Sequence, residues 1–291
     1  MSGMKSSTHP SETLLERLKD LDAQMHALLI ERAQVVQGLI AAHRATGDEG
    51  PVLDPVRDAE RMRLLVERHE GDLPLTAVEH LWRDIVATCA FLEAPFTVHL
   101  DGGAELLGML DAARYHFGFN PELEAGSDAA DVVGVVAGSQ NDIGLIALSD
   151  RSDLPWWRGL SETGARVTAR LPFLVLDTRP ADLPMLVISR AEVPRDQQDV
   201  IVYDARWGSV LPGDLMGQGI EVVSFHRSAS GVDALIAVSA DLDETEALKA
   251  CADAGAEPDV LRPVGGYTAA IDIESDTNEE FETVVTIVSE G

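Results

Sequence analysis

The charged residues with the most unusual setting lie in the first third of the sequence, among apolar neighbours. Arg32 follows Leu28 by four residues and precedes Val35 by three, so it lies on the apolar side of a predicted helix. A guanidinium group is always charged and needs an anionic partner in such a place. Arg32 therefore predicts either an anion-binding site or a buried ion pair, for instance with Glu93 or Asp54.

Two more basic residues extend this pattern. His43 lies 11 residues after Arg32, close to three helical turns, so the two residues share nearly one face about 16 Å apart. A histidine near a helix end also serves as a C-terminal cap, which is the other interpretation of His43. Arg57 lies in the first turn of the next predicted helix, between Asp54 and Asp58. These are either ordinary charges at a helix start or part of an anion site.

A long first helix must carry Arg32 and His43. Residues 12–45 contain few helix breakers, and large apolar residues recur there at 3–4-residue spacing: Leu14, Leu18, Leu21, Met25, Leu28, Val35 and Leu39. Such a helix is about 50 Å long, more than a domain of this size buries alone. We expect it to pack along a partner, which predicts a homodimer.

Two shorter helices follow. Asp54 and Pro55 are an N-cap and a first helical residue, and this helix runs to about His69. Pro74 opens a third helix that ends near Pro95. Its predicted inner face contains Trp82, Ile85, Val86, Cys89 and Glu93. A carboxylate on that face requires a cation or a raised pKa.

The pattern changes to strands and helices after Pro95. FTVHL and DIGLIAL are predicted strands, separated by the helix AELLGMLDAARYHFG and the run DVVGVVAG, and TARLPFLVLD and PMLVISRAE are further strands. From about Asp199, the predicted order of elements is βαββαβ, the ferredoxin-like pattern. The expected domains are an all-α three-helix region at 1–95, an α/β region at 96–195, a ferredoxin-like α+β domain at 196–272 and an acidic tail at 273–291.

Composition limits the classes of partner. A formal net charge of −28 repels nucleic acid and anionic membranes, so we expect neither as a partner. No apolar run reaches the ~20 residues of a membrane helix, and none precedes the first amphipathic helix. Two cysteines, Cys89 and Cys251, lie far apart, which fits a reducing compartment. The sequence predicts a cytoplasmic protein.

No nucleotide-binding or metal-binding pattern is present. The sequence contains no GxGxxG motif, no Walker motif and no metal-ligand spacing. We expect neither a cofactor nor a metal site.

The run LLERLKDLDAQMHALLIERAQVVQGLIAAHRATGDEGPVLDPVRDAERMRLL, followed by LWRDIVATCAFLE, resembles the all-helical chorismate mutases. The resemblance covers about residues 12–95. Its most specific pieces are LDAQMHALLIER, with Asp22 and Arg32, and the D-x-x-R spacing of Asp54 and Arg57. It implies an interlocked helical dimer that converts chorismate to prephenate in aromatic amino-acid synthesis.

The implied reaction is a pericyclic rearrangement of a dicarboxylate, so it needs positioning and charge stabilisation rather than a nucleophile. By resemblance, Arg32 and Arg57 hold the carboxylates of the substrate. Asp54 bonds a hydroxyl group or orients Arg57. Asp58 stands where the family has a glutamate that receives the substrate hydroxyl, and Glu93, if protonated, donates to the ether oxygen.

The sequence departs from the family at three of these places. An early arginine of the family aligns with Leu15, and Arg17 lies two residues away on a different face. A lysine of the family aligns with His43, which is only partly charged at neutral pH. Asp58 is one methylene shorter than glutamate. These departures imply a slow enzyme, one with a shifted pH dependence, or a protein without catalysis.

The second half carries its own resemblance. TVHLDGGAELLGMLDAARYHFG and DIGLIALSDRSDLPWWRGL resemble part of a prephenate dehydratase, and ALKACADAGAEPDVLRPVGGYT is similar to an amino-acid-sensing ACT domain. The Thr-Arg-Phe element of the dehydratases is missing, so we assign no dehydratase activity. An ACT-like domain implies phenylalanine or tyrosine bound near Gly217 and Gly219, which are equally well explained as turn glycines.

Three functions follow from these expectations. The first is a homodimeric chorismate mutase with a C-terminal sensing or structural module. The second is a regulator without catalysis that binds an aromatic metabolite or an enzyme of the shikimate pathway. The third is a bifunctional mutase and dehydratase, which the missing dehydratase element disfavours.

Overall fold

The computed structural model describes residues 10–46, 53–176, 179–209 and 211–273. Its contacts divide the chain into two units, residues 1–49 and 50–291. The first unit contains one helix, α1 (Pro10–Thr46), and every other element belongs to the second. None of the helices in the described ranges combines the length and apolarity needed to cross a lipid bilayer.

Helix α1 confirms the predicted long helix. Its 37 residues give a length of about 55 Å. The apolar stripe is exposed within the single chain, since six of its side chains are more than half accessible: Leu14, Leu18, Met25, Leu28, Val35 and Leu39. A helix that leaves such a stripe uncovered gains little stability from its own chain.

Helices α2 (Pro55–Arg68) and α3 (Leu75–Glu93) begin where the sequence predicts. The Asp54 carboxylate accepts from the backbone N–H groups of Val56 and Arg57 at 3.1 Å, and Pro55 occupies the first helical position. Helix α3 follows Pro74. These local signals fix both helix starts.

The buried face of α3 differs from the prediction, which placed Glu93 and Trp82 on an inner face. Those side chains are half-buried and exposed, respectively. The fully buried residues are Glu79, Arg83, Ala87 and Ala90. A pattern based on apolar residues misses this face because it consists of small alanines and a charged pair.

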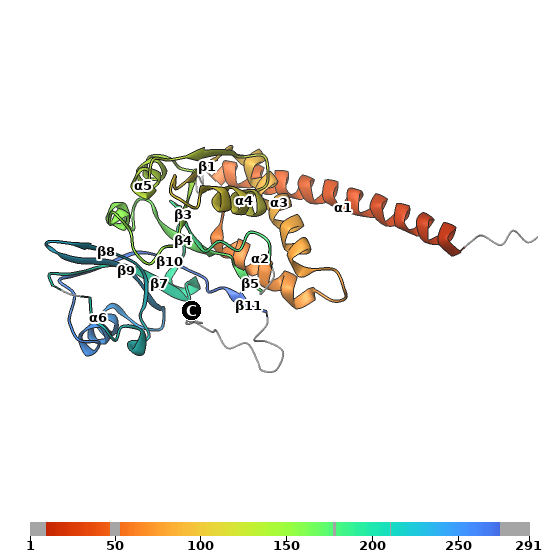
Figure 1. Ribbon diagram of the computed structural model, residues 1–291. Helices are drawn as coiled ribbons and strands as arrows, with labels where there is room; N and C mark the ends of the chain where they lie inside the picture. Colours follow the sequence, from red (N-terminus) through yellow and green to blue (C-terminus); the bar gives the residue numbers. More distant parts are fainter. Residues whose placement is uncertain (1–9, 47–52, 177–178, 210, 274–291) are drawn as a thin grey trace, which may run out of the picture. The chain divides into compact units, whose positions relative to one another are not determined.

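One mixed sheet organises the second unit (Figure 1). Its order among the described residues is β2-β1-β3-β6-β4-β10-β7-β9-β8. The pairs β2–β1, β1–β3 and β4–β10 are parallel and the others antiparallel. The bounds are β1 (Thr97–Leu100), β2 (Glu122–Ala125), β3 (Ile143–Ala147), β4 (Arg166–Leu171), β6 (Met185–Ser189), β7 (Val200–Trp207), β8 (Glu221–Ser228), β9 (Gly231–Ser239) and β10 (Val260–Tyr267).

Helices α4 (Leu106–Phe117) and α5 (Ala129–Gly138) connect the three parallel strands, so the chain runs β1-α4-β2-α5-β3. The run DVVGVVAG is part of α5. A short 3-10 helix, η1 (Trp156–Gly159), packs with α5 in the largest apolar cluster. A second 3-10 helix, η2 (Arg195–Gln197), precedes β7, and a two-stranded sheet pairs β5 (Leu174–Val175) with β11 (Ile271–Asp272).

The last part of the sheet has the strand order β10-β7-β9-β8, all antiparallel, which is the order of a ferredoxin-like βαββαβ unit. Helix α6 (Glu244–Asp253) starts with the capping box Asp243–Glu246 and lies on one side of these strands (Figure 1). The first helix of the predicted βαββαβ unit is reduced to the 3-10 turn η3 (Met216–Gln218). It ends at Gly219, whose φ of 75° is left-handed. Closely spaced glycines leave this segment too short for an α-helix.

These strands and those of the predicted α/β region belong to one sheet, because Gly265 of β10 pairs with Val167 of β4. Of the predicted acidic tail at 273–291, only Ile273 is among the described residues.

Candidate functional site

The start of α2 holds three of the predicted site residues. Arg57 Nε lies 3.1 Å from the Asp54 carboxylate, and both side chains are well exposed. The sequence interpretation in which Asp54 orients Arg57 is consistent with this pair. Because both side chains are exposed, both groups are accessible to a ligand. An exposed ion pair of this kind contributes little to stability.

Asp58 has a partner that the sequence analysis did not identify. Its Oδ2 accepts from Arg83 Nη1 at 2.7 Å, and its Oδ1 lies 3.5 Å from Arg61 Nη1. Arg83 is only 5% exposed, whereas Asp58 is 32% exposed. Asp58 therefore connects the surface of α2 with a buried charge on α3.

That buried charge belongs to a network centred on Glu79, which is fully buried. The Glu79 carboxylate accepts from Arg83 Nε at 2.9 Å and from the Tyr115 hydroxyl at 3.2 Å, and it lies 3.2 Å from Arg179 Nη1. Burial lowers the pKa of Arg83, but Asp58 and Glu79 raise it more, so its pKa lies above the ordinary value. Arg83 therefore remains charged.

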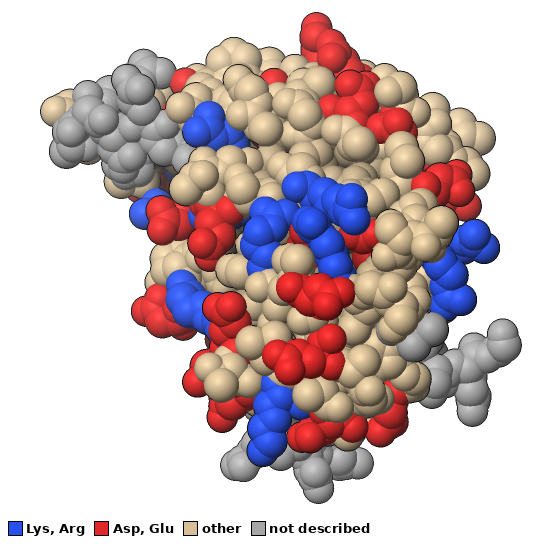
Figure 2. Space-filling model, turned by 90° about the vertical axis from the view of Figure 1, so that its left-hand side faces the viewer, with Lys and Arg blue, Asp and Glu red and all other residues tan. Residues whose placement is uncertain are grey.

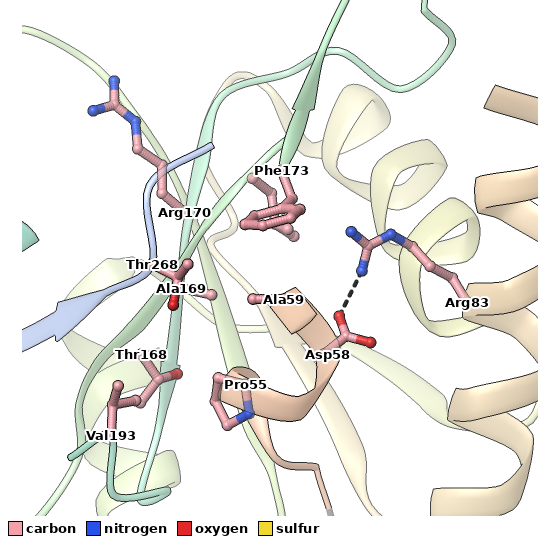
Figure 3. A pocket seen from close by; sticks show the side chains of 11 residues that line it. Pro55, Asp58, Ala59, Arg83, Thr168, Ala169, Arg170, Phe173, Val193 and Thr268 are labelled. Atoms are coloured by element: carbon pink, nitrogen blue, oxygen red, sulfur yellow. Dashed lines mark hydrogen bonds and ion pairs between the residues drawn. The ribbon is translucent and has the colours of Figure 1, made fainter. Parts of the chain in front are cut away.

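A small cleft of about 50 Å³ lies where α2 and α3 approach β4 (Figure 3). Figure 3 shows Asp58 and Arg83 facing each other beside it, with Ala59 and Phe173 near them and Arg170 pointing away. Arg170 instead pairs with Glu221 at 2.8 Å. The cleft has room for a few water molecules only. In this arrangement, it does not hold a ring-sized dicarboxylate.

The remaining predicted residues lie elsewhere. Glu93 ends α3, ten residues past Arg83, and therefore lies about 15 Å from it along the helix. The structure does not bring Glu93 to the Asp58–Arg83 pair. Arg17 is exposed and Arg32 half-buried on α1. The side chain of His43 lies outside the part of the chain that the structure describes.

Sequence reasoning missed the network of Glu79, Arg83, Tyr115 and Arg179. The spacing of Glu79 and Arg83 is a signal, since residues i and i+4 face each other on a helix. Arg179 has no comparable signal, because its contact with Glu79 joins segments 100 positions apart.

A larger cavity of about 450 Å³ lies at the carboxyl ends of β1, β2 and β3. Ligands bind at this edge in many open α/β sheets. Its charged lining residues are Asp101, Glu105, Asp128, Asp153 and Arg151. Burial, and to a smaller extent the nearby Asp128, raise the pKa of Asp101. Four carboxylates against one arginine disfavour a dianionic substrate in this cavity.

Comparison with family models gives one match. Residues 14–94 match the family model "Chorismate mutase type II". No curated protein matches the chain in sequence.

Two solved structures match the chain with low similarity. A prephenate dehydratase from Streptococcus mutans is 13% identical, with a TM-score of 0.37, and the match covers 61% of this chain and 99% of that one. GqqA, described as a novel type of quorum quenching acylase, is 12% identical with the same TM-score, covering 60% and 95%.

Proposed function

We propose that the protein is a chorismate mutase that rearranges chorismate to prephenate. The observation that carries this proposal is the family match over residues 14–94. A pericyclic reaction needs no cofactor and no nucleophile, only a site that holds two carboxylates and stabilises charge on the ether oxygen.

Arg32 and Arg57 are the proposed carboxylate ligands. A guanidinium group binds a carboxylate through two parallel hydrogen bonds, which fixes both position and charge. The exposed pair of Arg57 and Asp54 supports this role, because Asp54 holds the guanidinium group while most of it faces solvent. Asp54 also has lone pairs left for a substrate hydroxyl.

The other proposed roles are weaker contacts to the same substrate. Asp58 receives a hydroxyl group, and Arg17 substitutes for the cation that Leu15 cannot supply. His43 and Glu93 act in their protonated forms, His43 as a cation and Glu93 as a donor to the ether oxygen. Activity is therefore expected to rise as the pH falls below neutrality.

The proposed enzyme is a cytoplasmic homodimer, and the exposed apolar stripe of α1 supports the dimer. We further propose that the ferredoxin-like unit binds phenylalanine or tyrosine near Gly217 and Gly219. Calorimetry with millimolar amino acid tests this, and the absence of both heat and a melting shift leaves a structural module.

The alternative function is a regulator without catalysis that binds an aromatic metabolite or a shikimate-pathway enzyme. The ion pair between Asp58 and buried Arg83 favours this alternative, because Asp58 then binds an arginine of its own chain at the position where the family needs a substrate contact. Leu15 and His43 favour it as well, because they remove or weaken two cations.

Chorismate consumption by the purified protein from about pH 5 to 8 decides between the two functions. The mutase predicts prephenate formation that increases toward pH 5. Replacement of Arg32 by alanine should lower the rate about 100-fold or more. Binding of chorismate without turnover at any pH would support the regulator and refute the enzyme.

Arg32→Ala also separates an anion site from a buried ion pair. An arginine that holds substrate is not required for folding, so the melting temperature should change little. Loss of one partner of a buried pair instead costs about 3–5 kcal/mol of folding free energy. Thermal unfolding of Arg32→Ala beside the parent measures this, and a large destabilisation contradicts the substrate role.

A further inference from the structure

Three arginines gather over two aspartates on one face of the sheet. Side chains alternate along a strand, so Asp204 and Arg206 of β7 lie on the same face. The register places Asp204 opposite Arg262 of β10, and Arg206 opposite Asp233 of β9. Arg158 reaches the same place from η1. These five residues form the arginine cluster.

The contacts link the cluster into a chain of alternating charge. Asp233 Oδ1 accepts from Arg158 Nε at 2.8 Å and lies 3.6 Å from Arg206 Nε. Asp204 Oδ2 accepts from Arg206 Nη2 at 2.6 Å and from Arg262 Nη2 at 3.0 Å. Arginines occupy both ends and the middle of the chain, so the cluster has one positive charge in excess.

The excess charge faces outward. The side chains of Asp204 and Asp233 are 0% and 6% exposed, whereas those of the three arginines are 33–48% exposed. The surface of the chain is otherwise dominated by acid, with 50 acidic against 22 basic residues. Basic side chains nevertheless gather near the centre of the face drawn in Figure 2, with acidic ones around them.

The arginines still have hydrogen-bond donors to offer. Arg158 and Arg206 contact the aspartates through Nε and Nη2, which form one edge of each guanidinium group. No acceptor in the described part of the chain lies against Nη1 of either residue. A guanidinium group has five N–H donors, so each group can donate to a second anion at its outer edge.

We propose that the arginine cluster binds a small oxyanion, the phosphate or carboxylate group of a metabolite, between Arg158 and Arg206. A polyanion such as nucleic acid would meet the net charge of −28 over a large area. A small anion meets only the local field, because charges beyond about 8 Å are screened at physiological salt. None of the five cluster residues is among the proposed mutase residues.

Binding at this place would strengthen a junction between two parts of the second unit. Arg262 donates to the carbonyl oxygens of Leu160 and Arg158 at 2.5 and 3.2 Å, and so connects β10 with the η1 segment. An anion held by Arg158 and Arg206 adds a second connection between η1 and the sheet. A ligand that binds the folded state and not the unfolded state raises the melting temperature.

Inorganic phosphate and malonate are the probes, each titrated into the full chain by calorimetry and thermal melting at low ionic strength. We expect saturable binding of at least one probe, and the one that binds identifies the phosphate or the carboxylate source. Arg158→Gln should weaken it about tenfold or more, since a charged donor is lost. Arg68→Gln, which changes the same charge at an exposed position on α2, should leave it unchanged.

A second variant is expected to change binding in the opposite direction, which a folding defect would not produce. Asp233→Asn removes one of the two carboxylates, so the cluster gains positive charge and should bind the same probe more tightly. The proposal is overturned if neither probe binds, or if Arg158→Gln and Asp233→Asn bind as the parent does. In those cases, the cluster only joins strands.

Discussion

Glu79 is the residue on which the buried charges of the second unit converge. Its carboxylate pairs with two arginines that are 5% and 1% exposed, and it has no access to water itself. Removal of one partner from a buried ion pair costs about 3–5 kcal/mol, because the remaining charge is left uncompensated. We therefore expect Glu79→Ala to lose folding free energy of this size in urea unfolding.

Glu67→Ala is the matched control, since Glu67 is exposed on α2. It should change the free energy of unfolding by no more than about 0.5 kcal/mol. Equal, small losses for both variants would mean that Arg83 and Arg179 find other partners, and that the network does not stabilise the fold.

His116 is buried beside this network, and neither ring nitrogen has a partner among the described residues. Burial lowers the pKa of His116 well below its ordinary value, and Arg83 and Arg179 lower it further. Below about pH 6.5, the unfolded chain binds a proton that the folded chain refuses. Folding stability is therefore lost as the pH falls through this range.

His116→Phe should remove that part of the acid sensitivity and leave stability near neutral pH unchanged or raised, because an unsatisfied polar ring is replaced by an apolar one. Unfolding free energies at pH 7.5 and 5.5 measure it, with His69→Gln as a histidine control at the end of α2. A variant as acid-sensitive as the parent would show that other groups cause the loss.

At the residue scale, the sequence predicted contacts that are close along the chain. The Asp54 cap and its neighbour Arg57 follow from a D-P-x-R pattern at a helix start. The pairing of Asp58 with Arg83 joins two helices, and that of Arg179 with Glu79 joins a helix and a distant loop. Such contacts depend on tertiary packing, which spacing along one helix does not encode.

At the element scale, helix ends were predictable because each carries a local signal. Pro55, Pro74 and the Asp243 capping box mark the starts of α2, α3 and α6. The failure at η3 is also local, since glycine conformation outweighed the apolar pattern there. The buried face of α3 was mistaken because a paired glutamate and arginine occupy positions where a hydrophobic pattern expects apolar residues.

Helix α1 gives a prediction at this scale. Its exposed stripe should be covered by a second copy of the chain, because removing the apolar surface of several leucines from water is favourable by about 25 cal/mol per Å². Leu28→Lys, in the middle of the stripe, should shift the protein toward monomer in sedimentation at micromolar concentration. Gln37→Lys lies on the opposite side of the helix, at 100° per residue, and should not. A folded parent that sediments as a monomer contradicts the dimer.

At the scale of the whole molecule, the joining of nine of the described strands into one sheet was not predictable. Both halves were recognisable as α/β and ferredoxin-like patterns, but the pairing of β4 with β10 brings together segments nearly 100 residues apart. It involves close backbone approach at Gly265, where a Cβ would lie 2.2 Å from the Val167 carbonyl oxygen. A pairing between distant strands leaves no periodic signal in either one.

Net charge is a property of the molecule as a whole, and it predicts how salt acts on stability. With a formal charge of −28, the compact state repels itself more strongly than the expanded chain does. Raising NaCl from about 0.02 M to about 0.5 M shortens the screening length from roughly 20 Å to about 4 Å. Screening therefore removes repulsion between distant surface carboxylates, while the Glu79 network, excluded from water, is affected much less.

The melting temperature should rise with NaCl and with choline chloride alike, since screening does not depend on the cation. A fall in melting temperature would mean that exposed ion pairs such as Arg57–Asp54 contribute more than the repulsion does, and a rise with NaCl alone would indicate sodium binding instead of screening.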